Sequence, residues 1–364
     1  MRSELGQVCS RLSSGKGIPS SQISDAGEYP VYGGNGLRGY TDHANFEGEC
    51  AIIGRQGAFC GNVRFFSGKA YMTEHAVVVC ANEYSNTRYL AYLLSTMDLG
   101  RLSGQSAQPG LSVKTLAKQE IELPILKQQN RIVSILASLD DKIELNQKIN
   151  QNLERQAFTL FDRFLSTEHS SKCRLSQIAI INPKRILKKA EPARYIDMAQ
   201  LSTSGGFPNG WEVKPYNGGM RFSNGDTLLA RITPCLENGK TAYIDFLDEN
   251  EVAFGSTEYV VITSQGEYPP EFFYCLARYP AFVDYAVKNM NGSSGRQRVS
   301  AEAIGNYVLP MLTDDELSEF RSTVPCLFRA MRNNSIENMS LAQLRDALLP
   351  KLISGEIDVS THTD

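Results

Sequence analysis

Two stretches of this chain are rough copies of each other, and each copy is followed by a long segment with a heptad pattern. The first match pairs Leu5, Gln7 and Val8 with Leu175, Gln177 and Ile178. Further matches keep their order along the chain: Ile53-Gly54-Arg55 with Leu229-Ala230-Arg231, Met72-Thr73-Glu74-His75 with Ser256-Thr257-Glu258-Tyr259, Leu111-Ser112 with Val299-Ser300, and Leu123-Pro124 with Leu309-Pro310. Such duplication predicts two similar structural units instead of one unit with a single site.

In the segment after each copy, apolar residues recur at alternating steps of three and four, the spacing of a coiled-coil seam. Asparagines fall on this stripe in both segments, and a buried Asn fixes register at a cost in stability. Because the first helix enters the second copy and the second helix leaves it, we expect an antiparallel pair with one copy at each end. Asn146 then lies opposite Asn338, and Asn150 lies opposite Asn334. The predicted seam residues are Ile132, Leu136, Leu139, Ile143, Asn146, Asn150, Leu153, Leu160, Phe164, Phe320, Val324, Leu327, Met331, Asn334, Asn338, Leu341, Leu348 and Leu352.

The second helix has a predicted start, a predicted end and one weak point. Thr313 and Glu316 have the spacing of a capping box, and Gly355 is typical of a helix stop. Pro325 lies inside the helix, where it removes a hydrogen bond and is expected to cause a kink. The alternative to a helix pair is that each helix packs only on its own domain. A helix over residues 127–164 would be roughly 57 Å long, longer than a domain face.

The composition is that of a globular protein with more than one domain. The 364 residues are 42% hydrophobic and 21% charged, which allows two or three domains with substantial cores. We predict an α+β fold in which two similar mixed α/β domains are separated by two long helices that form an antiparallel coiled coil. The predicted parts are a first domain over residues 1–125, a helix over 126–166, a second domain over 167–312, a helix over 313–355 and a tail over 356–364.

Several classes of protein are disfavoured by the sequence. The longest apolar runs are shorter than a membrane span needs, and the N-terminus lacks a signal-peptide pattern. The eight cysteines are scattered without a Cys-x-x-Cys pair, as in a reduced cytoplasmic protein, and the four histidines are not spaced for a metal site. We find no base-methylation motif and no phosphate-binding loop, since Ser14-Gly15-Lys16-Gly17 lacks the required flanking residues. The net charge of −3 does not by itself indicate nucleic-acid binding.

The most suggestive polar residues are two arginines at equivalent places. Arg55 and Arg231 each follow a predicted strand and precede a glycine-containing turn. An arginine there can contact a guanine edge or a phosphate; the alternative is a surface arginine or a salt-bridged one. Glu74 and Glu258 begin strands, where each could accept from a cytosine amino group or cap local backbone amides.

Polar loops add further donors and acceptors in both copies, although such loops are often only solvated. The candidate DNA-contacting residues are Asn35, Arg38, Arg55, Gln56, Asn62, Arg64, Thr73, Glu74, His75, Gln105, Gln108, Arg221, Arg231, Thr233, Asn238, Lys240, Thr257, Glu258, Tyr259, Asn291, Ser293, Arg296 and Arg298.

The pattern as a whole resembles the specificity (S) subunit of type I restriction-modification systems. The resemblance covers residues 1–358. Its most specific pieces are Leu123-Pro124 leading into Gln128-Gln129-Asn130-Arg131-Ile132, the closing Leu348-Leu349-Pro350-Lys351-Leu352-Ile353-Ser354-Gly355-Glu356-Ile357, Arg231-Ile232-Thr233-Pro234-Cys235-Leu236-Glu237-Asn238-Gly239-Lys240, Gly255-Ser256-Thr257-Glu258 and Tyr29-Pro30-Val31-Tyr32-Gly33. The second helix departs from the family pattern, since it opens with Thr313-Asp314-Asp315-Glu316-Leu317 and carries Pro325.

The resemblance implies a cytoplasmic, non-catalytic subunit that reads double-stranded DNA. Each domain would be a target recognition domain for one half of a bipartite, asymmetric site, and the helix pair would set the spacer. The implied partners are two methyltransferase subunits that carry S-adenosylmethionine and motor-nuclease subunits that use ATP and magnesium, with no cofactor in this chain. The alternative function is a non-catalytic scaffold whose two domains bind proteins or glycans around a coiled-coil spacer. A nuclease or fused methyltransferase is a third option that the missing motifs disfavour.

Overall fold

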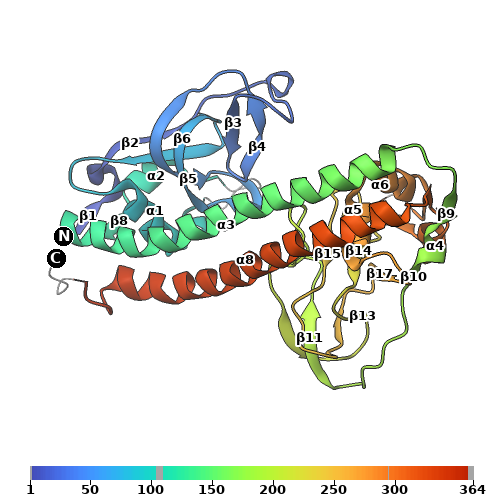
Figure 1. Cartoon of the computed structure of the whole chain (residues 1–364). Helices are drawn as coiled ribbons and strands as arrows, with labels where there is room; N and C mark the ends of the chain where they lie inside the picture. Colours follow the sequence, from blue (N-terminus) through green and yellow to red (C-terminus); the bar gives the residue numbers. More distant parts are fainter. Residues whose placement is uncertain (1, 104–109, 294, 360–364) are drawn as a thin grey trace. The chain divides into compact units, whose positions relative to one another are not determined.

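The computed structural model describes residues 2–103, 110–293 and 295–359 (Figure 1). Two compact units divide the chain: unit 1 contains Met1–Asp141 and Ala342–Asp364, and unit 2 contains Lys142–Leu341. Each of the two long helices therefore contributes one part to each unit. This division differs from the boundaries expected from the sequence, because the helices pack against the globular part of the unit in which they lie.

Unit 1 is built on a six-stranded sheet. One inner strand, second in the sheet and formed by Ala76–Ala81, is almost wholly apolar and buried on both faces: Val77 and Val79 pack under a helix, and Val78 packs on the opposite face with Ile52 and Met72. The sheet order is β2-β7-β5-β6-β3-β4, from β2 (Cys9–Ser14), β3 (Tyr29–Gly33), β4 (Gly36–Thr41), β5 (Phe46–Gly54), β6 (Val63–Met72) and β7 (Ala76–Ala81). The other elements are β1 (Arg2–Glu4) paired with β8 (Glu120–Glu122), α1 (Thr87–Ser95), α2 (Val113–Ala117), and the short turns η1 (Leu5–Val8), η2 (Ser20–Gln22), η3 (Gly57–Phe59) and η4 (Leu99–Leu102).

Unit 2 has two four-stranded sheets. The first, in the order β10-β17-β14-β15, contains β10 (Ala179–Ile181), β14 (Thr227–Ala230), β15 (Thr241–Tyr243) and β17 (Tyr259–Ser264). The second, in the order β12-β11-β16-β13, contains β11 (Pro192–Ile196), β12 (Glu212–Pro215), β13 (Met220–Phe222) and β16 (Ala253–Gly255). The remaining elements are β9 (Lys172–Arg174) with β20 (Val308–Pro310), β18 (Met290–Asn291) with β19 (Arg298–Val299), α4 (Leu175–Ile178), α5 (Pro270–Arg278), α6 (Pro280–Lys288) and α7 (Ala301–Gly305).

The duplication expected from the sequence is present in the strand pairing. In unit 1 Ile53 pairs with Val77, and in unit 2 the matching Leu229 pairs with Val260. The long strand β5 of unit 1 corresponds to β13 and β14 together, because Phe46 pairs with Ala70 as Phe222 pairs with Ala253. Strand β6 is likewise split into β15 and β16 by residues 244–252. This interruption turns one six-stranded sheet into two smaller sheets.

Two of the residue matches expected from the sequence are shifted by the observed register. Gly54 pairs with Ala76 and Ala230 pairs with Tyr259, so Glu258 corresponds to His75 and not to Glu74.

The match of Leu123-Pro124 with Leu309-Pro310 is also wrong. Ser3 pairs with Ile121, and the equivalent Cys173 pairs with Leu309. Short similar sequences therefore located the copies correctly but not always to the residue.

The long helices α3 (Leu126–Ser166) and α8 (Asp314–Ser354) run antiparallel in each unit (Figure 1). In unit 2 the Asn146 amide donates to Asn338 at 2.9 Å, and the Asn334 amide donates to Asn150 at 2.8 Å, which confirms the predicted register. In unit 1 the same direction brings Arg345 Nη1 to 2.9 Å from Asp140 Oδ1.

Helix α8 starts with the predicted capping box. The Glu316 amide donates to Thr313 Oγ1 at 3.3 Å, and the Thr313 amide donates to Glu316 Oε2 at 2.8 Å. The helix is assigned without interruption through Pro325 to Ser354. The proline, expected to cause a kink, therefore does not divide α8 into two helices.

The predicted seam is narrower than the buried face of the helices. All the predicted seam residues are buried or half-buried, but Phe161 and Phe328, which are almost fully buried, were not among them. Phe161 packs on Phe272 of α5, with ring centroids 5.0 Å apart, and Phe328 packs on Tyr243 at 5.2 Å. In each unit, α3 and α8 thus pack on each other and on the globular part of that unit. The helix pair and its alternative, packing of each helix on its own domain, therefore occur together.

Within the described residues, none of the helices combines the length and the apolar character that spanning a bilayer requires.

Candidate nucleic-acid interface

An arginine occupies the same backbone position in both units. In unit 1 the amide of Arg55, directly after β5, donates to the His75 carbonyl at 3.0 Å, and the Arg55 carbonyl accepts from the Leu111 amide at 2.8 Å. In unit 2 the Arg231 amide donates to Glu258 at 3.0 Å, and its carbonyl accepts from Val299 at 3.0 Å. The backbone on both sides of each arginine is therefore fixed by the neighbouring segments, and the repeated position inferred from the sequence is confirmed.

Neither of these two guanidinium groups forms an ion pair within 4.0 Å in the described part of the chain. Arg55 Nη1 donates to Ser14 Oγ over 3.4 Å, which is a long contact. Arg231 Nε is buried and has no hydrogen-bond partner among the described residues. A buried donor without a partner costs free energy. These contacts argue against the alternative of a salt-bridged arginine and leave both cations able to meet an external acceptor.

A glycine turn lies close to the Arg55 backbone. A Cβ on Gly34 would lie 2.7 Å from the His75 carbonyl oxygen and 3.2 Å from the Arg55 amide nitrogen, so only glycine allows this approach. Gly36 has φ +98°, and a Cβ there would lie 3.3 Å from Arg64 Cζ.

The predicted residues Asn35, Arg38, Gln56, Asn62 and Arg64 are exposed in this part of unit 1. We call the end of β5 with its neighbouring turns the strand-end surface of unit 1.

The segment Thr73-Glu74-His75 adjoins this surface, because the His75 carbonyl accepts from the Arg55 amide. Glu74 Oε1 lies 3.3 Å from His75 Nε2, and both side chains are about half exposed. Glu74 Oε2 is buried and has no hydrogen-bond partner in the described structure. Thr73 is fully buried, with its hydroxyl also lacking a described partner, and this burial argues against the predicted DNA contact for that residue.

In unit 2 the structure brings two predicted residues onto each other. Arg298 Nε donates to Glu258 Oε2 at 2.8 Å, and Arg298 Nη2 donates to Glu258 Oε1 at 2.7 Å. Arg298 Nη1 donates to the Arg296 carbonyl at 3.1 Å. The Arg298 guanidinium holds the pKa of the Glu258 carboxyl below its usual range. Glu258 is therefore committed to an ion pair, which neither reading of its role anticipated.

The other predicted residues of unit 2 differ in their burial and in the contacts that their side chains make within the protein. Lys240 Nζ donates to the Met198 carbonyl at 2.8 Å, and the Arg221 guanidinium lies 5.9 Å from the centre of the Tyr216 ring. Tyr259 is fully buried, and its hydroxyl reaches the Ile196 carbonyl at 3.3 Å, so its predicted DNA contact is disfavoured by burial.

Among the rest, the Thr233 amide donates to the Gln297 carbonyl at 3.1 Å. The side chains that the structure leaves exposed are Asn238, Thr257, Asn291, Ser293 and Arg296. Gln105 and Gln108 lie outside the described residues.

One group of residues next to Arg55 was missed. Ser14 lies at the end of β2 beside Arg55, and the following Lys16 is exposed, with its amide bonded to Met72 at 2.9 Å. In the sequence, these residues indicate only a possible phosphate-binding loop, and that interpretation is rejected because the flanking residues are missing. Their position depends on the pairing of β2 with β7, which links segments far apart in the chain.

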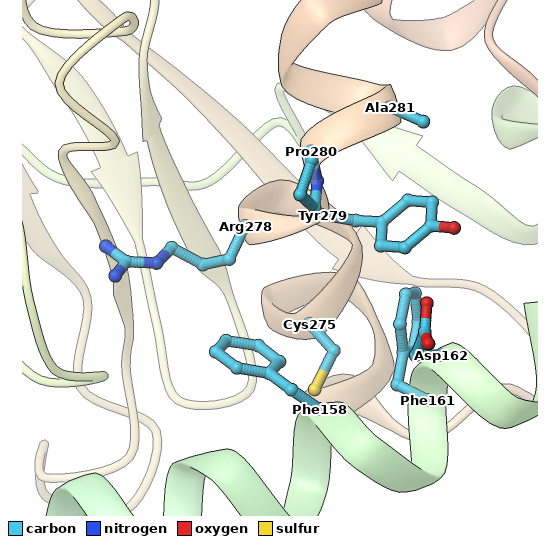
Figure 2. Close-up of a pocket in the computed structure, with 8 residues that line it drawn as sticks. All are labelled: Phe158, Phe161, Asp162, Cys275, Arg278, Tyr279, Pro280 and Ala281. Atoms are coloured by element: carbon cyan, nitrogen blue, oxygen red, sulfur yellow. The ribbon is translucent and has the colours of Figure 1, made fainter. Parts of the chain in front are cut away.

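A pocket in unit 2 is lined mainly by apolar and aromatic residues. This pocket of about 520 Å³ lies between α3 and the α5–α6 corner (Figure 2). It is lined by Phe158, Phe161, Asp162, Cys275, Arg278, Tyr279, Pro280 and Ala281. None of these is a predicted DNA-contacting residue. The described residues also contain no group of three or more His, Cys, Asp or Glu side chains placed to hold a metal ion.

Comparison with known proteins finds similar sequences and a similar fold. Residues 1–155 match the type I restriction modification DNA specificity domain. The chain is 38% identical over 143 residues to the specificity subunit of the EcoprrI type I restriction enzyme of Escherichia coli, covering 38% of this chain and 35% of that protein. It is 22% identical over 328 residues to the HindI specificity subunit of Haemophilus influenzae, covering 68% of this chain and 71% of that protein.

A solved structure shares the fold over almost the whole chain. The S subunit of a type I restriction-modification system from M. genitalium superposes with a TM-score of 0.60 at 18% identity, covering 97% of this chain and 95% of that one. At this identity the likeness concerns the fold alone. It extends the similarity to the second copy and the second long helix, beyond the residues matched by the specificity domain.

Proposed function

We propose that this chain, which belongs to the family of type I restriction-modification DNA specificity subunits, is the subunit that reads the target sequence. Residues 1–125 and 167–312 would be two target recognition domains, each reading one half of a bipartite site in double-stranded DNA. The observation that carries this proposal is the pair of equivalent arginines, Arg55 and Arg231, held by matching backbone hydrogen bonds in the two units and left without ion-pair partners in the described structure.

The chemistry of these positions suits DNA. A guanidinium can donate two parallel hydrogen bonds to the O6 and N7 atoms of guanine, and it can also bind a phosphate. Exposed Asn35 and Asn62 in unit 1 and Asn291 in unit 2 add side-chain amides, which can recognise adenine. The corresponding end of β14 with its neighbouring turns is the strand-end surface of unit 2. Since the two strand-end surfaces differ in these side chains, the two half-sites would differ in sequence.

The remaining chemistry of the system would come from other subunits. We propose that two methyltransferase subunits carrying S-adenosylmethionine and motor-nuclease subunits using ATP and magnesium assemble with this chain in the cytoplasm. This chain would be non-catalytic and would bind no cofactor. The antiparallel helix pair, which in each unit packs against the globular part, would set the spacer between the half-sites.

The proposal is tested by producing the full chain with its cognate methyltransferase and mapping adenine methylation in host DNA. We expect a single bipartite motif that is absent when this chain is omitted. A scaffold with two protein-binding or glycan-binding domains, the alternative function, would copurify with other partners and leave the methylation pattern unchanged. Methylation without any sequence preference would contradict the proposal.

A further inference from the structure

We infer that Glu258 and Arg298 are positioning residues that hold Arg231 and the adjoining loop in place for DNA contact, and that they do not contact bases themselves. This inference rests on the proposed function. It replaces the DNA contacts predicted for Glu258 and Arg298 by an ion pair between these two residues, which we call the clamp. The clamp joins the start of β17 to β19 through the paired guanidinium and carboxylate described above.

The ion pair closes a ring around the Arg231 backbone. The Glu258 carbonyl accepts from the Arg231 amide at 3.0 Å, and the Val299 amide donates to the Arg231 carbonyl at 3.0 Å. Glu258 and Arg298, the residue before Val299, then join through their side chains. The Arg231 backbone is thus held on both sides by two segments that the ion pair ties together.

The same arginine also contacts the residues directly before it. Arg298 Nη1 donates to the Arg296 carbonyl at 3.1 Å, and the Gln297 carbonyl accepts from the Thr233 amide at 3.1 Å. Residues 296 and 297 are therefore held beside the segment that contains Arg231, while the Arg296 side chain stays exposed. Arg231, which has no ion pair among the described residues, and the exposed Arg296 can both meet DNA.

Charge and hydrogen bonding both argue against direct DNA contact by the clamp. All three guanidinium nitrogens of Arg298 already donate within the protein. If Arg298 turned toward DNA, Glu258 would be left as an unpaired carboxylate close to a polyanion. Paired, the two residues are neutral as a unit and add no repulsion of phosphate.

The clamp belongs to the second copy only. The strand register makes His75 the counterpart of Glu258. The isolated bridge between Gln56 and Gly110 corresponds to the bridge between Ile232 and Arg298, so Gly110 is the counterpart of Arg298. A glycine has no side chain to form the pair. Loss of the clamp should therefore affect one half-site and leave the other unchanged.

The test measures binding of the full chain to a duplex that contains the motif found by methylation mapping and to a duplex with that motif scrambled. Arg298→Ala and Glu258→Ala should each weaken binding to the motif roughly tenfold, the scale expected for hydrogen bonds to a charged group. The slope of affinity against salt should stay unchanged, because no phosphate contact is lost. The control Arg296→Ala, in the same loop but outside the clamp, should reduce that slope by about one.

Charge exchange gives the decisive comparison. Glu258→Arg combined with Arg298→Glu should recover most of the lost affinity, and duplexes mutated in the other half-site should rank as they do for the native chain. The inference is overturned if Glu258→Ala leaves motif binding unchanged or strengthens it, or if the exchanged pair binds as weakly as Arg298→Ala.

Hydrogen exchange of the free chain separates this inference from the proposed function. Arg298→Ala should speed exchange of the Thr233 and Val299 amides, and the exchanged pair should restore their protection. Unchanged exchange overturns the clamp even if the native chain prefers the motif. A native chain that does not prefer the motif overturns the proposed function and the DNA role of the clamp, whatever the exchange data show.

Discussion

The side-chain amide of Asn146 donates a hydrogen bond to Asn338 Oδ1 at 2.9 Å, from one long helix to the other. The same amide nitrogen also donates to Glu337 Oε2 at 2.7 Å, and Asn146 is 1% exposed. A buried side-chain amide whose N–H groups find acceptors in only one register penalises every shifted pairing. This contact therefore fixes how the two helices are aligned in unit 2.

Replacing one asparagine of this pair should lower the free energy of unfolding more than replacing both asparagines by leucine. We expect Asn338→Ala to lower the free energy of unfolding by about 1 kcal/mol, because the buried Asn146 loses a partner. The double change Asn146→Leu with Asn338→Leu should recover that loss, since apolar side chains suit a coiled-coil seam. Urea denaturation measures both. Exposed Asn152→Ala on the same helix is the control, and equal losses for the single and double variants would contradict the prediction.

Shortening both helices by one heptad should shorten the DNA spacer. Deleting residues 143–149 together with 335–341 keeps the Asn150–Asn334 pair and removes about 10 Å of helix, or about 3 base pairs of DNA. Methylation mapping should show both half-sites unchanged and the spacer reduced. Deleting only one of the two segments should disrupt the register instead. A spacer that stays at its native length would mean that the helix pair does not set it.

Arg55→Ala and Arg231→Ala should each relax recognition in a different half-site. A lost bidentate contact to guanine costs about 1–3 kcal/mol of discrimination at that position. The readout is the set of methylated sequences for each variant. Arg174→Ala, an exposed arginine outside both strand-end surfaces, serves as the control. If both variants weaken binding equally on all sequences, the two arginines are phosphate contacts.

Phe328→Ala should destabilise unit 2 much more than Leu327→Ala. Phe328 is 1% exposed and packs against Tyr243 and Tyr274, so its truncation should cost about 3–5 kcal/mol. Leu327, the residue expected from the heptad pattern, is only half-buried and should cost less. Denaturation followed by circular dichroism compares the two. A larger loss of stability for Leu327→Ala than for Phe328→Ala would instead support the seam expected from the heptad pattern.

The Glu258–Arg298 ion pair should make stability depend on acid pH. The pKa of Glu258 is lowered in the folded chain, chiefly by Arg298, while in the unfolded chain it is about 4.3. The contribution of the pair is complete above the unfolded value and is lost as the pH falls through the lowered value. We expect Glu258→Gln to cost about 0.5–1 kcal/mol at pH 7 and nothing at strongly acid pH. A difference that does not change with pH would exclude this ionisation as its cause.

The sequence by itself determined the duplication, the two long helices and the register between them. These features follow from local and periodic patterns: a heptad stripe identifies the face of a helix, and two asparagines on each stripe leave one alignment in which all four meet in pairs. The position of Arg55 and Arg231 was also accessible, because a strand end followed by a glycine turn is a local signal that occurs in both copies.

Only the tertiary structure decided which of the polar candidates are free and which apolar residues complete the helix faces. Arg298 meets Glu258, 40 residues away in the chain, through a strand register that no local pattern specifies, and the burial of Tyr259 depends on the neighbouring sheet. Phe328 is buried because α8 packs on a globular surface as well as on α3, whereas the heptad pattern describes contact with a single helix. Contacts between distant segments depend on how the whole chain packs, and that packing assigns each side chain to the core, to an internal ion pair or to the surface.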